Sequence, residues 1–321
     1  MDELSRIKNV LGSVNASKAL TVGFFIFVCS GCSLPLRFAS RAVETLGQPV
    51  EQVLQKNPTP ILPKVGLSIL WVGHATMLIQ IGDKVFLTDP VFTTTVGLVA
   101  RRSVEPGIEP TAITRVDYTL ISHLHFDHFS FGSLELVPKA GKLLVPPGGA
   151  EYTPEFGFAE THEMKPWEVV EENGVKITAV PVRHFGGRYG FDILWMQDKG
   201  YVGYVIEYGG VTVFFGGDTG YGPEFTEIGR RFSIDVAILP ISPVEPREFM
   251  SRVHLDPREA VKAFEDLHAR IMIPMHYATF FQGLEPKPTY AGDLLTEIVE
   301  REKLQEKIQI LRIGEQRIIV P

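Results

Sequence analysis

The chain has 321 residues, of which 45% are hydrophobic and 21% are charged, and its formal net charge at pH 7 is −7. This is an ordinary globular composition, sufficient for one large domain or two small ones. Because the net charge is negative and the basic residues are scattered, the chain lacks the basic face that a nucleic-acid partner requires, and we expect no nucleic acid among its partners.

The N-terminal segment, residues 1–32, has the features of an export signal. Basic residues are followed by an apolar run from Ala19 to Cys29 that is short for a membrane span, and small residues precede Cys32. This ending resembles a bacterial lipoprotein signal, which would make Cys32 the lipidated first residue of the mature chain. The alternative is an uncleaved N-terminal anchor. In both cases we expect a membrane-associated protein. The lipoprotein reading, which we favour, predicts a lipid-anchored protein in the periplasm or cell envelope of a bacterium.

Residues 33–64 are predicted to be a tether. Gly47, Pro49, Pro58 and Pro60 interrupt this segment, so a single long helix is not expected there. The remainder, residues 65–321, is predicted to fold as one domain.

The first half of this domain begins with short strands and tight turns. Alternating apolar residues predict a hairpin whose turn is Gly82-Asp83. The predicted strands are Leu67–Val72, Met77–Ile81, Lys84–Thr88, Val116–Ile121 and Lys142–Val145. A helix is expected near Ser130–Val137, between the last two strands.

Four strong metal ligands lie in the stretch from His123 to His128, directly after a predicted strand. His123 and His125 alternate around one apolar residue, so an extended backbone points both imidazoles the same way. Asp127 and His128 follow where the chain must turn, and can face a second point beside the first. Imidazole and carboxylate ligands suit zinc, manganese or iron, and the absence of thiolate argues against a purely structural zinc site. A surface histidine cluster is the alternative, but this spacing favours a metal site.

The second half repeats the pattern of strands followed by helices. Its predicted strands are Val175–Val182, Tyr201–Tyr208, Val211–Phe215, Asp235–Leu239 and Arg270–Ile273. Asp256 followed by Pro257 predicts the start of one helix, and another is expected near Tyr290–Lys303. Strands and then a helix in each half indicate an α/β fold of four αββα layers, with two mixed sheets packed together and helices outside.

Three further candidate ligands occupy equivalent places. His184, Asp218 and His276 each follow a predicted strand, as the His123–His128 stretch does. Taken alone, each has an ordinary reading as a loop, turn or core-edge residue. Loops at strand ends are where sites are usually assembled, so together they favour one metal-binding pocket.

The complete pattern resembles the metallo-β-lactamase superfamily: a His-x-His-x-Asp-His stretch, a lone histidine, a Gly-Asp-Thr-Gly turn and a final histidine follow one another in that order. A closer resemblance, to the N-acyl-phosphatidylethanolamine-hydrolysing phospholipase D branch, covers about residues 67–282. The blocks that carry it are Trp71-Val-Gly-His-Ala-Thr76, Phe86-Leu-Thr-Asp-Pro90, Gly217-Asp-Thr-Gly-Tyr221, Ile228-Gly-Arg-Arg-Phe232, Glu245-Pro-Arg-Glu-Phe-Met250 and His254-Leu-Asp-Pro257.

The resemblance implies a binuclear centre with two zinc ions, although another divalent metal would suit the same ligands. The ligands that it implies are His123, His125 and His184 for one ion, Asp127, His128 and His276 for the other, and Asp218 bridging both. Asp127 and His254 would be catalytic, and Asp89 would orient a ligand histidine through a hydrogen bond. The alternative for His254 is a partner that caps the following helix. His74 and Thr76 are expected to be structural.

The function implied by the resemblance is zinc-dependent hydrolysis of a phosphodiester in N-acyl-phosphatidylethanolamine-like lipids, with a metal-bound hydroxide as the nucleophile. The membrane surface, reached through the N-terminal anchor, and a membrane phospholipid would then be partners, and a homodimer is implied as well. Two alternatives remain open. One is a metallo-hydrolase that acts on a lactone, a β-lactam or another ester, and the other is a membrane-tethered metal-binding protein without catalysis.

Overall fold

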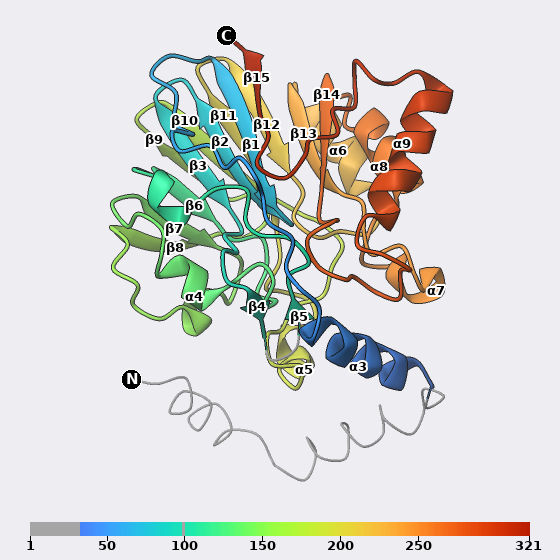
Figure 1. Ribbon diagram of the computed structural model, residues 1–321. Coiled ribbons are helices and arrows are strands. Elements are labelled where there is room, and N and C mark those ends of the chain that lie inside the picture. The colour runs from blue at the N-terminus through green and yellow to red at the C-terminus, as the bar shows by residue number, and fades with distance from the viewer. Residues whose placement is uncertain (1–32, 98–99) are drawn as a thin grey trace.

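The computed structural model describes residues 33–97 and 100–321, so the predicted leader, residues 1–32, lies outside the described residues. Within the described part of the chain, no helix is both long and apolar enough to cross a membrane. The fold is built on two large sheets and a small hairpin, with helices packed on the outside (Figure 1).

The first sheet has seven strands in the order β15-β1-β2-β3-β6-β7-β8. The three pairs from β15 to β3 are antiparallel, and the three pairs from β3 to β8 are parallel. The strands are β1 (Leu67–Gly73), β2 (Thr76–Ile81), β3 (Lys84–Thr88), β6 (Tyr118–Leu120), β7 (Lys142–Val145), β8 (Glu160–Glu163) and β15 (Gln316–Val320).

The second sheet has six strands in the order β14-β13-β12-β11-β10-β9. The pairs from β9 to β12 are antiparallel, and β12, β13 and β14 are parallel. The strands are β9 (Val169–Glu172), β10 (Val175–Val180), β11 (Gly203–Tyr208), β12 (Val211–Phe215), β13 (Val236–Pro240) and β14 (Ile271–Met275). Both large sheets are therefore mixed, as predicted.

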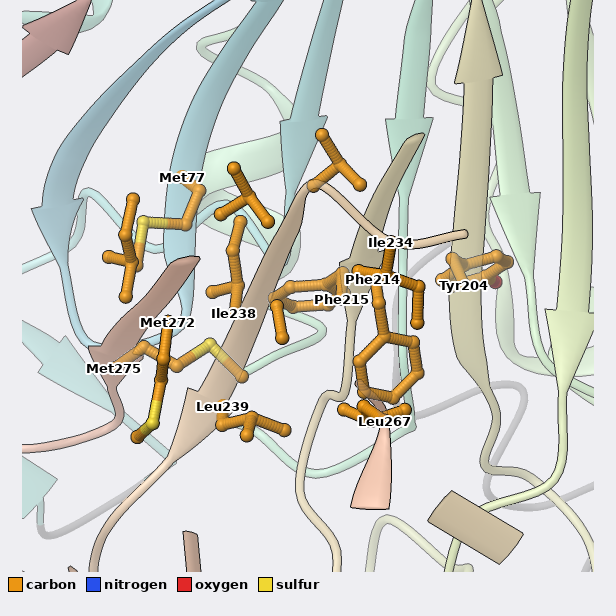
Figure 2. Packing of buried hydrophobic residues seen from close by; sticks show 14 of the residues in the cluster. Met77, Tyr204, Phe214, Phe215, Ile234, Ile238, Leu239, Leu267, Met272 and Met275 are labelled. Atoms are coloured by element: carbon orange, nitrogen blue, oxygen red, sulfur yellow. The ribbon is translucent and has the colours of Figure 1, made fainter. Parts of the chain in front are cut away.

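Alternation along the strands explains why the sheets stack. In β1, Ile69 and Trp71 belong to the cluster shared with the second sheet, whereas Leu70 and Val72 belong to a cluster on the opposite face. Successive strand residues point to opposite faces, so a strand that is apolar throughout must be covered on both sides. Figure 2 shows part of the shared cluster, including Met77 from the first sheet and Phe214 from the second.

Helices cover the outer faces. Beside β13 and β14 lie α6 (Glu224–Arg231), α8 (Pro257–Asp266) and α9 (Tyr290–Glu302) (Figure 1). The short α4 (Phe131–Leu134) contributes to the cover of the first sheet through Leu134. The other short elements are α5 (Ile193–Met196), α7 (Arg247–Met250), the 3₁₀ turns Pro110–Ala112 and Ala150–Tyr152, and the hairpin strands β4 (Thr95–Val96) and β5 (Ala100–Arg101). The predicted four-layer α/β fold is confirmed.

Residues 33–64, predicted as a tether without a long helix, begin with helix α3 (Ser33–Leu46). Gly47, Pro49, Pro58 and Pro60 lie after the helix, so they end it rather than prevent it. Arg101 donates to the carbonyl oxygen of Leu46 at 2.9 Å, and Arg41 donates to that of Glu285 at 3.3 Å. The segment is therefore in contact with the domain.

Candidate metal centre

The predicted ligands follow strands that end at a common edge of the fold. His123 to His128 come after β6, and Asp89 comes directly after the neighbouring, parallel β3. In the second sheet, Asp218 follows β12 and His276 follows β14, which run parallel to β13 between them. The carboxyl ends of parallel strands meet at one edge, so these side chains converge although their positions in the chain are far apart.

Three histidines form the first group of ligands. His123 Nε2 lies 2.9 Å from His125 Nδ1, and His184 Nε2 lies 3.2 Å from the same atom. The outer nitrogen of His184, Nδ1, lies 3.0 Å from the carbonyl oxygen of Val253. A carbonyl oxygen only accepts, so Nδ1 carries the proton and the lone pair of Nε2 points inward. The group has the form of a trihistidine metal site.

The second group joins both sheets. His128 Nε2 lies 3.2 Å from His276 Nε2, and each of these atoms is 3.9 Å from Asp127 Oδ2. His276 Nδ1 donates to the carbonyl oxygen of Ser242 at 2.8 Å, which again leaves Nε2 free to face inward. Two imidazoles and one carboxylate thus surround a second point.

Asp218 lies between the two groups. Its Oδ2 is 3.0 Å from His276 Nε2, 3.4 Å from His128 Nε2 and 3.9 Å from His123 Nε2. Gly217, with φ of 58°, turns the chain directly before it, and a Cβ there would lie 2.4 Å from that of Ser122. The turn therefore requires glycine, and it delivers the carboxylate that can reach both groups.

The electrostatics of the centre suit cations. Burial, reinforced by neighbouring histidines, lowers the pKa values of His123 and His184 well below the usual range. Burial raises the pKa of Asp218, but attraction to His276 and His128 outweighs it, so this pKa lies well below its usual value. His123 and His184 are thus neutral and Asp218 is ionised, the protonation states in which these groups bind divalent metals. Burial lowers the pKa of His128, but attraction to Asp218 and Asp127 outweighs it and raises this pKa well above its usual value, so His128 must release a proton to bind a metal.

A buried oxygen atom without a hydrogen-bond partner also indicates that the centre binds cations. Asp218 Oδ1 is buried, and no hydrogen-bond partner for it lies among the described residues. A buried carboxylate oxygen is costly unless a cation or a donor satisfies it. Imidazole and carboxylate groups are ligands of zinc and of other first-row metals, so the residues present fit a pair of divalent cations.

Asp89 lies directly behind His128. Its Oδ2 accepts hydrogen bonds from His128 Nδ1 at 2.8 Å and from the Ser122 hydroxyl at 2.6 Å, and its Oδ1 accepts one from the Ser122 amide at 2.7 Å. All three partners donate, so only a carboxylate satisfies them. The predicted role of Asp89, to orient a ligand histidine, agrees with this geometry.

Asp89→Asn is expected to weaken metal binding by about 10–100-fold, because in either orientation the amide group would face a donor. Isothermal titration of the metal-free protein with Zn²⁺ measures this. The exposed Asp198 provides the control, and Asp198→Asn is expected to bind like the wild type. Equal affinity in the two variants would contradict the role of Asp89.

His254 lies at the rim of the centre. Its Nδ1 is 3.6 Å from Asp218 Oδ2, and its ring stacks on that of His276 at 5.7 Å. The alternative role, capping the next helix, belongs to Asp256, whose side chain accepts from the amide of Glu259. Burial lowers the pKa of His254 to about 3, so its imidazole is neutral at pH 7.

His74 was expected to be structural, and the structure places it inside the centre. Its Nε2 lies 3.1 Å from Asp127 Oδ2, and its ring centroid lies 4.1 Å from that of His276. His74 has this place because it lies in the turn between β1 and β2. The block Trp71-Val-Gly-His-Ala-Thr76 contains it, but no spacing in the sequence relates that block to the other ligands.

Arg188 ties two ligand loops together. Its guanidinium donates to the carbonyl oxygen of Leu124 at 3.1 Å, inside the His123–His128 stretch, and to that of Phe129 at 2.7 Å, directly after it. The cation also lies over the Phe131 ring at 4.0 Å. This arginine follows His184 by four residues, so it fixes the loop of one ligand against the loop of four others. No motif or spacing in the sequence pointed to Arg188.

Glu285 is a buried carboxyl group close to His276. Its Oε1 accepts from the Ser242 hydroxyl at 3.0 Å and the Val244 amide at 2.6 Å, while Oε2 has no partner among the described residues. Only 1% of the residue's surface is exposed, and burial raises its pKa from 4.5 to about 7. This carboxyl group therefore keeps its proton in the folded protein at mildly acidic pH.

Glu285 is expected to contribute about 1–3 kcal/mol to the free energy of unfolding at pH 4.5 and to lose this contribution as the pH rises to 7, because the unfolded chain releases the Glu285 proton first. Glu285→Gln removes the titration and should lack this decline. Urea unfolding at several pH values measures the free energy of unfolding of the wild type and of Glu285→Gln. An equal slope in the variant would contradict the assignment.

Comparison with known proteins agrees with this geometry. Residues 84–277 match the family model described as a β-lactamase superfamily domain. The chain is 28% identical over 266 residues to N-acyl-phosphatidylethanolamine-hydrolyzing phospholipase D 1 of Caenorhabditis elegans, covering 75% of this chain and 72% of the worm protein. It is 30% identical over 253 residues to a metal-dependent hydrolase of Methanopyrus kandleri, covering 78% of this chain and 98% of that protein.

Among solved structures, the isothiocyanate hydrolase from Delia radicum gut bacteria has the same fold, with a TM-score of 0.65 at 18% identity. The match covers 79% of this chain and all of that structure. The predicted resemblance to metallo-β-lactamase-fold hydrolases and to the phospholipase D branch is confirmed.

Proposed function

The chain belongs to the β-lactamase superfamily and is a metal-dependent hydrolase, and from this premise we propose that it is a zinc-dependent phosphodiesterase of the phospholipase D type. Its substrate would be an N-acyl-phosphatidylethanolamine-like lipid, and its products a phosphatidic acid and an N-acylethanolamine. The observation that carries the proposal is the convergence of seven ligands into two groups joined by Asp218. The relative from Caenorhabditis elegans supports the substrate class.

A bound pair of divalent cations would supply Lewis acidity, lowering the pKa of water and offsetting negative charge on a phosphoryl group. The residues that would hold one cation are His123, His125 and His184, those that would hold the other are Asp127, His128 and His276, and Asp218 lies within reach of both groups. Burial raises the pKa of Asp127, but His128 and His74 outweigh burial, and the pKa lies well below its usual value. Asp127 therefore stays ionised and acts as a ligand rather than as a strong base.

His254 would contact the substrate. It lies at the edge of the centre, and its Nδ1 has no hydrogen-bond partner among the described residues. A neutral imidazole offers one N–H donor and one lone pair. We propose that the N–H of His254 donates to a phosphoryl oxygen of the substrate, orienting the phosphodiester for attack by water.

The lipid anchor is part of the same proposal. The apolar run that ends at Cys29 and the small residues before Cys32 support export and lipidation. An anchored enzyme is confined to the bilayer surface, where a phospholipid substrate is concentrated. Mass spectrometry of the mature protein should find lipid on Cys32, and an intact, unmodified N-terminus would contradict this part of the proposal.

The direct test uses zinc-loaded protein, mixed micelles of N-acyl-phosphatidylethanolamine and water labelled with ¹⁸O. Attack of water on phosphorus, with departure of the N-acylethanolamine oxygen, places the label in phosphatidic acid and leaves the N-acylethanolamine unlabelled. His123→Ala is the inactive control. Release of no N-acylethanolamine, or faster turnover of a lactone, β-lactam or simple ester by the same preparation, would overturn the proposal.

A further inference from the structure

His74 is held in the centre by its own backbone. It lies in the turn between β1 and β2 with φ of 54°, and its amide donates to the Thr279 hydroxyl at 2.6 Å. Its carbonyl oxygen accepts from the Trp71 indole at 2.9 Å and from the amide of His276 at 3.0 Å. These bonds fix the imidazole relative to His276, a candidate ligand that is distant in the chain.

The ring of His74 faces the carboxylate of Asp127. The side chain is fully buried, its Nε2 is 3.1 Å from Asp127 Oδ2, and Phe280 meets the ring edge-on at 5.0 Å. A carboxylate ligand has no proton to give, so Nε2 must carry it and donate to Oδ2. This hydrogen bond uses one lone pair of Asp127 Oδ2 and fixes the plane of the Asp127 carboxylate.

We propose that His74 is a positioning residue that holds the Asp127 carboxylate in the orientation needed to bind the cation shared with His128 and His276. Carboxylate ligands of metals are themselves hydrogen-bonded, and the loss of such a partner weakens the metal bond. The inference rests on the metal centre of the proposed function and not on its lipid substrate. His74 therefore acts on one of the two groups and leaves the trihistidine group untouched.

The test is competitive titration of metal-free protein with Zn²⁺ against a chromophoric chelator, with no substrate present. His74→Phe keeps the ring but removes the donor. It is expected to bind the first equivalent like the wild type and the second about 10–100-fold more weakly. His74→Gln can place an amide N–H near the same point and should recover most of that loss. His268, an exposed histidine with a similar φ of 50°, provides the matched control His268→Phe.

Several outcomes would overturn the inference. Unchanged affinity for both equivalents in His74→Phe would show that the donor is not needed. Equal weakening of both equivalents, together with a lower melting temperature of the metal-free protein, would show a merely structural role. If His74→Gln also lost the second equivalent and the absorption spectrum of its Co²⁺ form changed, His74 would be a ligand itself. Wild-type protein that bound no metal would refute the proposed centre as a whole.

Discussion

Asp218→Asn is expected to lower hydrolysis by at least about 10²–10³-fold, the size typical for the loss of one charge-stabilising group at a reacting centre. Asp218 Oδ2 is the atom that lies near imidazoles of both groups, 3.0 Å from His276 Nε2 and 3.9 Å from His123 Nε2. An amide of the same shape keeps the packing but removes the negative charge, so two cations held close together would lose the anion between them.

Metal analysis of Asp218→Asn by plasma mass spectrometry should accordingly return at most one equivalent, whereas the wild type returns two. The control is Asp198→Asn, which changes an exposed carboxylate and should keep both metal and activity. A variant that retained two equivalents and wild-type turnover would contradict the bridging position of Asp218.

The largest expected effect on stability is that of Phe214→Ala, about 3–5 kcal/mol, the usual cost of truncating a buried phenylalanine. Phe214 has no exposed surface and lies in β12, at the centre of the second sheet. Its ring meets that of Phe225 of α6 edge-on at 6.3 Å, so truncation would leave a cavity between the sheet and this helix.

Urea unfolding monitored by circular dichroism measures this cost. Phe249→Ala is the matched control, because Phe249 is 53% exposed on the short helix α7. Its truncation should change the free energy of unfolding by less than about 0.5 kcal/mol. Similar losses in both variants would show that Phe214 does not pack in the core as described.

The central strands could be predicted because their side chains form runs of apolar residues that are typical of buried strands. The predicted Lys84–Thr88, Lys142–Val145 and Val211–Phe215 coincide with β3, β7 and β12. Helix α8 begins after Asp256, whose side chain accepts from the amide of Glu259, as the sequence predicted. In both cases the determining interactions are local or depend on burial alone, so a single sequence contains them.

The missed strands lie at sheet edges. β8 has the sequence Glu-Thr-His-Glu and β9 is largely exposed, so neither has an apolar pattern that marks a strand. Both are held by backbone hydrogen bonds to a neighbour, which do not depend on side-chain type. Helix α6 was missed as well, because Gly229 in its interior counts against a helix. That glycine admits the backbone of Asp266, and a Cβ there would lie 2.5 Å from its carbonyl oxygen.

The residues of the candidate centre likewise fall into two groups, those that the sequence indicated and those that it did not. The His123–His128 stretch is compact in sequence, so its ligand types and spacing indicated metal binding directly. The parts of the centre contributed by His74 and Arg188 depend on loops that meet only in three dimensions. Neither has a spacing signal, and both contact the ligand stretch from elements that are distant in the chain.

The hydrogen bond from the amide of His276 to the carbonyl oxygen of His74 has a consequence for biosynthesis. While the chain leaves the ribosome, strands β1 to β8 emerge with an incomplete set of candidate ligands, and His276 arrives only after β14 has been made. A nascent chain that captured a metal ion early would hold it with an unfinished coordination sphere. Completion of the centre thus reports that translation has passed the final parallel strand.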